Sequence, residues 1–326
     1  MGRSAPIGQK GVFYMGRKEG GSLFHQMINA PDVFIYSHRT DKDGNAMAVS
    51  DQTRKNYQNW LHKSADYFKG LGIRRLSDID KEKIQAYADY LKANGKTAST
   101  IHSYLSPLCK ATGVELAEIE KPIRHASEFI RSSGVGKADG GRPAELNAMI
   151  GLREDELRQL RGSDIKERNG NTSVIVRRGK GGKYQEQKVL PEDVAAVRKF
   201  FDGSEHKVFR MHEFVSGFDY HGQRREHAYK MLVYYTERLR TEPGYRKKLY
   251  KELADQWHRN NKKHRDKLEP LSFFDKPYIL RGKNRALAIA QGKPIVLDRL
   301  ALRAVSILHL AHWRDKVTVQ SYYFSR

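Results

Sequence analysis

The sequence predicts a mainly α-helical protein with a small β-sheet, that is, an α+β chain. Apolar residues recur at helical spacing through residues 50–120 and again through residues 221–239. Two short runs, 173–176 and 185–189, instead have the composition of strands, and a turn of glycines and lysines separates them. With 326 residues, the chain is long enough for two domains of ordinary size.

The charge of the chain is strongly positive. Its 60 lysines and arginines against 38 acidic residues give a formal net charge of +22, spread along the whole sequence. Such a surface gains salt-dependent affinity by neutralising phosphates, so the composition favours a nucleic acid as partner. The alternative is a basic protein whose charge only aids solubility. The single cysteine, Cys109, fits a reducing compartment, and no apolar run of about 18 residues suits a membrane span.

Residues 1–46 are rich in glycine, charge and turn signals, and only residues 33–36 resemble a strand. We therefore expect an N-terminal arm or extension there. A helical domain is expected over residues 47–125. Its helices are marked by apolar stripes, by Asp80 and Thr97 as N-caps, and by Gly70 and Gly113 as stops.

Pro107 is expected to kink or shorten the third of these helices. Residues 126–142 hold turn-forming residues and are predicted to be a linker. The second domain is expected over residues 143–326. It contains a helix interrupted near Gly151, the hairpin, a helix over 221–239 and a late apolar helix capped by Asp298. A strongly basic segment lies within residues 235–285.

Four short segments hold residues that could act on a phosphate. Arg153 lies beside a leucine stripe, where a rigid guanidinium could grip two phosphate oxygens. Lys180 lies in a glycine-rich turn that lacks the Walker pattern, and its ammonium could protonate a leaving alkoxide. A solvated arginine and an ordinary hairpin tip are the plainer interpretations of these two residues.

His221 and Arg224 are three positions apart and so share one face of a helix. An imidazole can exchange a proton near neutral pH, and the arginine can bind a phosphate oxygen. A solvated pair on a charged helix is the alternative. His312 precedes two adjacent tyrosines, Tyr322 and Tyr323, whose commonest role would be packing.

Taken in order, these segments resemble the tyrosine recombinases of the phage-integrase type. Residues 151–165, Gly-Leu-Arg-Glu-Asp-Glu-Leu followed by a Leu and an Asp-Ile pair, are similar to the first arginine box of that family. Residues 179–183 resemble its lysine hairpin, and His221-x-x-Arg224 resembles its second box. Leu-Ala-His-Trp at 310–313, followed by Tyr322, resembles its third box and nucleophile. The resemblance spans about residues 50–326.

The resemblance implies a core-binding domain over 47–125 and a catalytic domain over 143–326, with the basic insertion at about 235–285. It implies a site-specific DNA recombinase that integrates, excises or resolves a phage, plasmid or other mobile element through a 3′-phosphotyrosyl intermediate. A type IB topoisomerase-like enzyme and a non-catalytic DNA-binding protein are the alternatives. The implied catalytic residues are Arg153, Lys180, His221, Arg224, His312 and Tyr322, and no cofactor or metal is required.

The spacing from His312 to Tyr322 is one residue longer than is common in that family, so Tyr323 is the competing nucleophile. Double-stranded DNA is the expected partner, with a homotetramer on synapsed sites, a monomer or dimer when free, and accessory DNA-bending proteins. The expected location is cytoplasmic and nucleoid-associated. The residues expected to contact DNA are Arg54, Lys55, Lys96 and Lys183.

Overall fold

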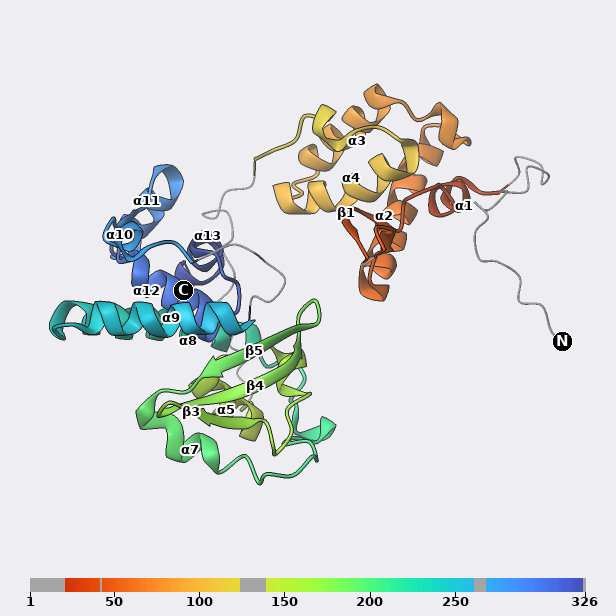
Figure 1. Cartoon of the computed structure of the whole chain (residues 1–326). Helices are drawn as coiled ribbons and strands as arrows, with labels where there is room; N and C mark the ends of the chain where they lie inside the picture. The colour runs from red at the N-terminus through yellow and green to blue at the C-terminus, as the bar shows by residue number, and fades with distance from the viewer. Residues whose placement is uncertain (1–20, 42, 124–138, 261–267, 325–326) are drawn as a thin grey trace. The chain divides into compact units, whose positions relative to one another are not determined.

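The computed structural model of the chain describes residues 21–41, 43–123, 139–260 and 268–324 (Figure 1). It divides into two compact units, Met1–Arg124 and His125–Arg326. Most described elements are helices, and three small antiparallel sheets accompany them. The predicted class, mainly α with a small sheet content, is confirmed. Most of the expected linker, 126–142, lies outside the described residues.

Three helices form the body of the first unit. They are α2 (Asp51–Gly70), α3 (Lys81–Ala93) and α4 (Ala98–Thr112), with 3-10 turns at Leu76–Asp78 and Leu116–Glu118. The side chains of Ser50, Asp80 and Thr97 each accept a hydrogen bond from a first-turn amide, as N-caps do. Gly113, with φ of 77°, ends α4 in the left-handed conformation.

Pro107 does not shorten α4, one of the two effects expected of it. The helix continues to Thr112, and Pro107 is buried inside it. The helix is held by packing, because its apolar face carries Ile101, Leu105 and Leu108, all fully buried in the core of the unit. Burial of this face outweighs the hydrogen bond that proline cannot make.

The structure differs from the expected N-terminal arm over residues 21–41 and 43–46. Helix α1 (Leu23–Ile28) packs Leu23 and Met27 into the core formed by α2, α3 and α4. Strands β1 (Ile35–Thr40) and β2 (Ala46–Ala48) then form an antiparallel hairpin. Because the apolar residues of α1 span less than two turns, their helical spacing was too short to stand out in the sequence.

The second unit begins with α5 (Gly141–Ile150) and α6 (Glu154–Leu157), which Gly151 separates with φ of 63°. A three-stranded sheet follows, in the order β3 (Ile165–Arg168), β4 (Asn171–Gly179) and β5 (Lys183–Lys188). The predicted hairpin is therefore present, with its turn at residues 180–182. A 3-10 turn at Pro191–Asp193, α7 (Val194–Arg198) and a 3-10 turn at Met211–Glu213 connect the sheet to the next helices.

Two long helices, α8 (Tyr220–Thr241) and α9 (Tyr245–Asn260), lead into the C-terminal part of the unit. Short elements follow: α10 (Leu271–Phe274), β6 (Tyr278–Ile279), α11 (Gly282–Ala290) and β7 (Val296–Leu297). Helix α12 (Arg299–Ala304), capped by Asp298, runs into a π-helical turn, Val305–His309. Helix α13 (Asp315–Thr318) and a second π-helical turn, Val319–Tyr323, complete the unit.

The expected basic insertion is folded into this unit over its described residues. Tyr245, Leu249 and Leu253 of α9 are buried in the same core as α8 and α12. Residues 261–267, which belong to the basic segment, lie outside the described residues. Among the described helices, none combines the length and apolar character needed to cross a bilayer.

Candidate functional site

Arg224 is the centre of the candidate site in the second unit. Its side chain comes from the first turns of α8 and is fully buried. Nη1 donates to the carbonyl of Gly151 and Nη2 to the carbonyl of Leu310 at 2.9 Å, so two separate turns fix the plane of the guanidinium. Burial lowers the pKa of Arg224, but an arginine remains charged in proteins. The arrangement therefore holds a desolvated positive charge in one orientation.

Glu156 links Arg224 to Arg153. Nη1 of Arg153 donates to Oε1 of Glu156 at 2.5 Å, and Nη1 of Arg224 lies 3.9 Å from its Oε2. The carboxylate is 2% exposed. Burial by itself raises the pKa of Glu156, but the charges of Arg224 and Arg153 outweigh burial and lower it below its usual value. Glu156 is therefore ionised at neutral pH and orients both guanidinium groups.

Tyr322 brings the hydroxyl of its phenol to this charged group. The hydroxyl lies 2.9 Å from Nε2 of His312 and accepts a bond of 3.5 Å from Nε of Arg224. The ring of His221 lies close by, with its centroid 6.1 Å from that of Tyr322. Burial, followed by the charges of Arg224 and Arg153, lowers the pKa of His312 to about 3. His312 is therefore a neutral imidazole.

Tyr323, the competing nucleophile, points elsewhere. Its hydroxyl donates to the carbonyl of Pro294 at 2.5 Å, and its ring packs against Tyr229 and the Lys293 ammonium. Burial raises the pKa of Tyr323, which makes its phenolate harder to form. Of the two adjacent tyrosines, Tyr322 is thus the one beside the arginine and histidine side chains.

Lys180 occupies the turn between β4 and β5, and only its backbone is tied to the site. Its amide lies 3.4 Å from Oε1 of Glu156, while its side chain is exposed. Among the described contacts, none joins the Lys180 ammonium to Tyr322 or Arg224. The charges of Lys183 and Lys180 nevertheless contribute to the lowered pKa of His312, so the hairpin turn carries its positive charge toward the site.

The turn that carries His312 is held by residues that sequence reasoning missed. His309 is fully buried, with Nδ1 3.1 Å from Nε2 of His227 and Nε2 2.9 Å from the hydroxyl of Tyr235. The amide of Gln187 donates to the His309 carbonyl at 2.6 Å. Burial lowers the pKa of both histidines, that of His227 to about 4. A buried, uncharged network thus fixes the turn whose next carbonyl, that of Leu310, binds Arg224.

Backbone strain marks the same turn. Ala311 and Trp313, on either side of His312, have φ of 49° and 63°. Non-glycine residues adopt this region rarely and at a cost of about 1–3 kcal/mol. The strain persists because packing holds it: the ring of Trp313 lies edge to face with Trp257, with centroids 4.9 Å apart. The turn therefore directs His312 at Tyr322, although its backbone departs from the conformation that Ala311 and Trp313 would prefer.

Comparison with known proteins gives a family match in the first unit. Residues 45–110 match the family model of the phage integrase N-terminal SAM-like domain. The first unit therefore contains a phage integrase N-terminal SAM-like domain. The match agrees with the resemblance seen in the sequence for α2, α3 and most of α4, a domain that lies outside the candidate site.

Two solved structures show distant similarity to this chain. A post-cleavage complex of the XerH site-specific recombinase with palindromic difH has 13% identity and a TM-score of 0.40, covering 84% of this chain and 77% of that one. A pre-cleavage XerH–difH complex has 14% identity and a TM-score of 0.38, covering 82% and 76%. No curated protein matches the sequence.

The side chains expected to contact DNA are exposed. Arg54, Lys55 and Lys96 belong to the first unit of the chain and Lys183 to the second. Arg54 lies over the ring of Phe34, with its guanidinium carbon 4.7 Å from the ring centroid. Exposure is necessary for a phosphate contact, and the role of these four residues stays a prediction.

Proposed function

We propose that this protein is a tyrosine recombinase, a catalytically active, site-specific enzyme that cuts and rejoins double-stranded DNA through Tyr322. One observation carries the proposal: the Tyr322 hydroxyl lies within 3.5 Å of a fully buried Arg224 and 2.9 Å from His312. A phenol held against a desolvated guanidinium suits attack on a phosphate whose oxygens that guanidinium binds. Integration, excision or resolution of a mobile element is the expected biological outcome.

In the proposed step, the Tyr322 oxygen forms a bond to phosphorus and the bond from phosphorus to the 5′ oxygen breaks. The phenol proton passes to His221, and Lys180 supplies a proton to the departing 5′ oxygen. A 3′-phosphotyrosyl linkage and a free 5′-hydroxyl result. A 5′-hydroxyl from another strand reverses the step, so the phosphodiester energy is conserved and no nucleotide cofactor is consumed.

Arg153 and Arg224 would bind the non-bridging phosphate oxygens and stabilise the added charge of the pentavalent state. Glu156 supports this role because its carboxylate orients Arg153 directly and lies near Arg224. The neutral imidazole of His312 would hold the phenol in line before attack. Loss of one such electrostatic donor costs roughly 10²–10³ in rate.

A library of nicked suicide duplexes with degenerate sequence tests the proposal without knowledge of the target. The protein is incubated with the library, denatured in SDS, and the DNA that remains attached is recovered. We expect a covalent adduct that Tyr322→Phe abolishes and Tyr323→Phe retains, with the modified peptide identified by mass. An adduct on any other side chain contradicts the proposal.

The two alternatives predict different outcomes of the same experiment. A type IB topoisomerase-like enzyme would form the Tyr322 adduct and relax supercoils, but would not exchange strands between two recovered sites. A non-catalytic DNA-binding protein would bind the library and yield no adduct at all. Cross-linking on the recovered sites then tests the expected tetramer, with a monomer or dimer in the absence of DNA.

A further inference from the structure

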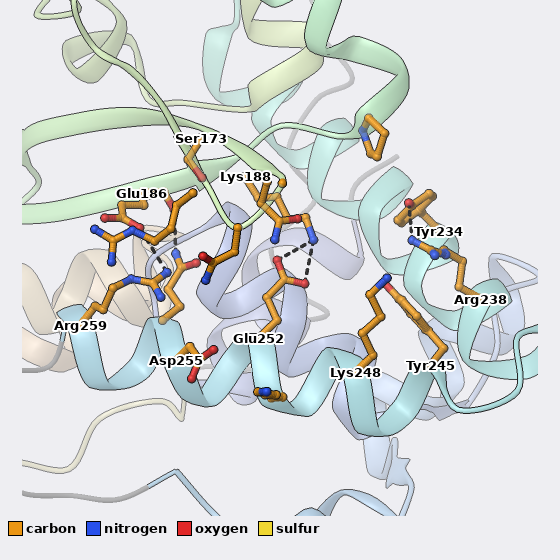
Figure 2. A pocket seen from close by; sticks show the side chains of 17 residues that line it. Ser173, Glu186, Lys188, Tyr234, Arg238, Tyr245, Lys248, Glu252, Asp255 and Arg259 are labelled. Atoms are coloured by element: carbon orange, nitrogen blue, oxygen red, sulfur yellow. Dashed lines mark hydrogen bonds and ion pairs between the residues drawn. The ribbon is translucent and has the colours of Figure 1, made fainter.

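A cleft separate from the Tyr322 site lies between helix α9 and the three-stranded sheet (Figure 2). Its volume is about 440 Å³, and residues of β3, β4, β5, α8 and α9 line it. The register Ser173↔Lys188 places it at the open end of the β4–β5 hairpin, whereas Lys180 occupies the turn at the other end. None of the six candidate catalytic residues lines it.

Cations dominate the lining. Three carboxylates face six positively charged side chains, which are Arg168, Lys188, Arg238, Lys248, Lys251 and Arg259. Half of these cations are neutralised by ion pairs. Lys188 pairs with Glu252 at 2.6 Å, Arg259 with Glu186 at 3.3 Å, and Arg238 with Glu242.

The other half keep their charge available to a ligand. Within the described ranges, Arg168, Lys248 and Lys251 form no ion pair, and all three are exposed. Of the acidic residues in the lining, Asp255 alone forms no ion pair with another residue that the structure describes. Lys248 also lies in the first turn of α9, where the helix dipole adds positive potential. The cleft therefore attracts an anion.

A buried hydroxyl without a partner gives the second indication of a ligand. Tyr245 lines the cleft at its Lys248 end and is 5% exposed, yet its hydroxyl has no hydrogen-bond partner among the described residues. Burial raises the pKa of Tyr245, so the phenol is protonated at neutral pH and able to donate. Arg238 stacks on its ring at 4.1 Å, which fixes the ring in place.

We propose that this cleft binds the phosphodiester backbone of duplex DNA beyond the cleaved phosphate. Lys248 and Lys251 would pair with phosphates along the rim, and the Tyr245 hydroxyl would donate to a phosphate oxygen. A polar, open hollow rimmed by lysines matches a repeating anion better than an apolar ligand. The proposal extends the proposed function with a DNA contact carried by the basic segment of α9.

The salt dependence of DNA binding tests the proposal, because each phosphate contact contributes about 0.9 to the slope of log K against log salt. Anisotropy with a labelled duplex of arbitrary sequence compares the full-length wild type with Lys248→Gln/Lys251→Gln. We expect the slope of the double variant to be shallower by about 1.8. The control, Lys199→Gln/Lys207→Gln, removes two exposed lysines outside the cleft and should keep the wild-type slope. The proposal is overturned if the slope becomes equally shallow in both double variants, or if Lys248→Gln/Lys251→Gln keeps the wild-type slope.

Tyr245→Phe gives an independent measurement. Removal of a hydroxyl without an internal partner should leave Tm unchanged and weaken DNA binding about three- to tenfold. If Tyr245→Phe binds DNA with the wild-type affinity, the Tyr245 hydroxyl does not donate to a DNA phosphate. If the lysine variant binds DNA normally but loses thermal protection by a nucleoside monophosphate, the ligand is a free phosphate compound and the DNA assignment is wrong.

These measurements are separable from the test of the proposed function. Tyr322→Phe should keep the wild-type salt slope, and Lys248→Gln/Lys251→Gln should still form the Tyr322 adduct at low salt and saturating DNA. If no adduct forms, the assignment of Tyr322 as nucleophile is wrong, and the proposal that the cleft binds DNA is unaffected.

Discussion

Nε of the fully buried Arg224 lies 3.5 Å from the hydroxyl of Tyr322. The other two nitrogens of the same guanidinium are occupied by the carbonyls of Gly151 and Leu310. A charge removed from water must have its donors satisfied, and here the backbone satisfies two of them. The Nε–H is directed at the phenol, and one N–H on each terminal nitrogen is not used by these three bonds. The position of Arg224 therefore couples the fold of two turns to the reactive group.

Arg224→Lys should abolish most of the activity although it preserves the charge. A single ammonium cannot reach both carbonyls and the phenol, because it lacks the planar fork of arginine. We expect adduct formation to slow by roughly 10²–10³, together with a lower Tm. The rate is measured in single-turnover cleavage of a recovered site.

Arg225→Lys is the matched control. Arg225 is the next residue of α8 and is also buried, but its guanidinium bonds the side chain of Asp219 at 3.1 Å rather than the site. Its variant should cleave at close to the wild-type rate. Equal slowing of both variants would show that the effect arises from the stability of α8.

Gly151→Ala should destabilise the second unit strongly. Gly151 has φ of 63°, and a Cβ there would lie 2.4 Å from the ring of His227. Alanine would have to adopt a left-handed backbone conformation, and its Cβ would clash with a buried ring. Both effects fall in a turn whose carbonyl binds Arg224. Gly170→Ala is the control, since its φ is 73° but no atom lies within 4 Å of the added Cβ. We expect Gly170→Ala to cost about 1–2 kcal/mol and Gly151→Ala clearly more, as measured by chemical denaturation.

The sequence predicted the elements whose signals are local. Asp80, Thr97 and Asp298 cap helices as expected, Gly113 and Gly151 adopt left-handed conformations, and the glycine-rich turn joins two strands. Each depends on a residue whose own backbone or side-chain preference decides the outcome. The packing of α1 and the continuation of α4 through Pro107 depend instead on distant partners, and no local pattern reveals them.

The same distinction holds at the candidate site. The order of the motifs in the sequence pointed to residues that lie close together in the structure. These are Arg153, Arg224, His312 and Tyr322, and His221 lies beside them. It did not reveal His309, His227 and Tyr235, because their hydrogen bonds join residues more than 70 positions apart. Glu156 did have a signal, since it lies three residues after Arg153 at the start of a helix and so faces the same side.

Glu156→Gln should remove a pH-dependent part of the stability. The folded-state pKa of Glu156 is lowered, so its contribution is present above the unfolded pKa and is lost as pH falls through the folded pKa. At pH 7 we expect a loss of roughly 3 kcal/mol, because the buried Arg224 loses its nearby negative charge. The difference in the free energy of unfolding between wild type and variant should become smaller below about pH 4.5, as measured by urea denaturation. Glu145→Gln, an exposed carboxylate of α5, should show no such gap at any pH.

His227→Asn should make the fold less sensitive to mild acid. Burial lowers the pKa of His227 to about 4 and holds that of His309 well below its usual value. Because the folded state resists protonation, stability should be complete above the unfolded pKa near 6.5 and should fall as pH drops toward about 4. Each such histidine contributes a slope of up to about 1.4 kcal/mol per pH unit. The variant lacks one titrating group, so its slope should be shallower. Tyr235→Phe, which removes a hydrogen bond to His309 but no titrating imidazole, should lower stability and leave the slope unchanged. If His227→Asn keeps the wild-type slope in denaturation series from pH 7 to 4, His227 is not neutral in the folded protein.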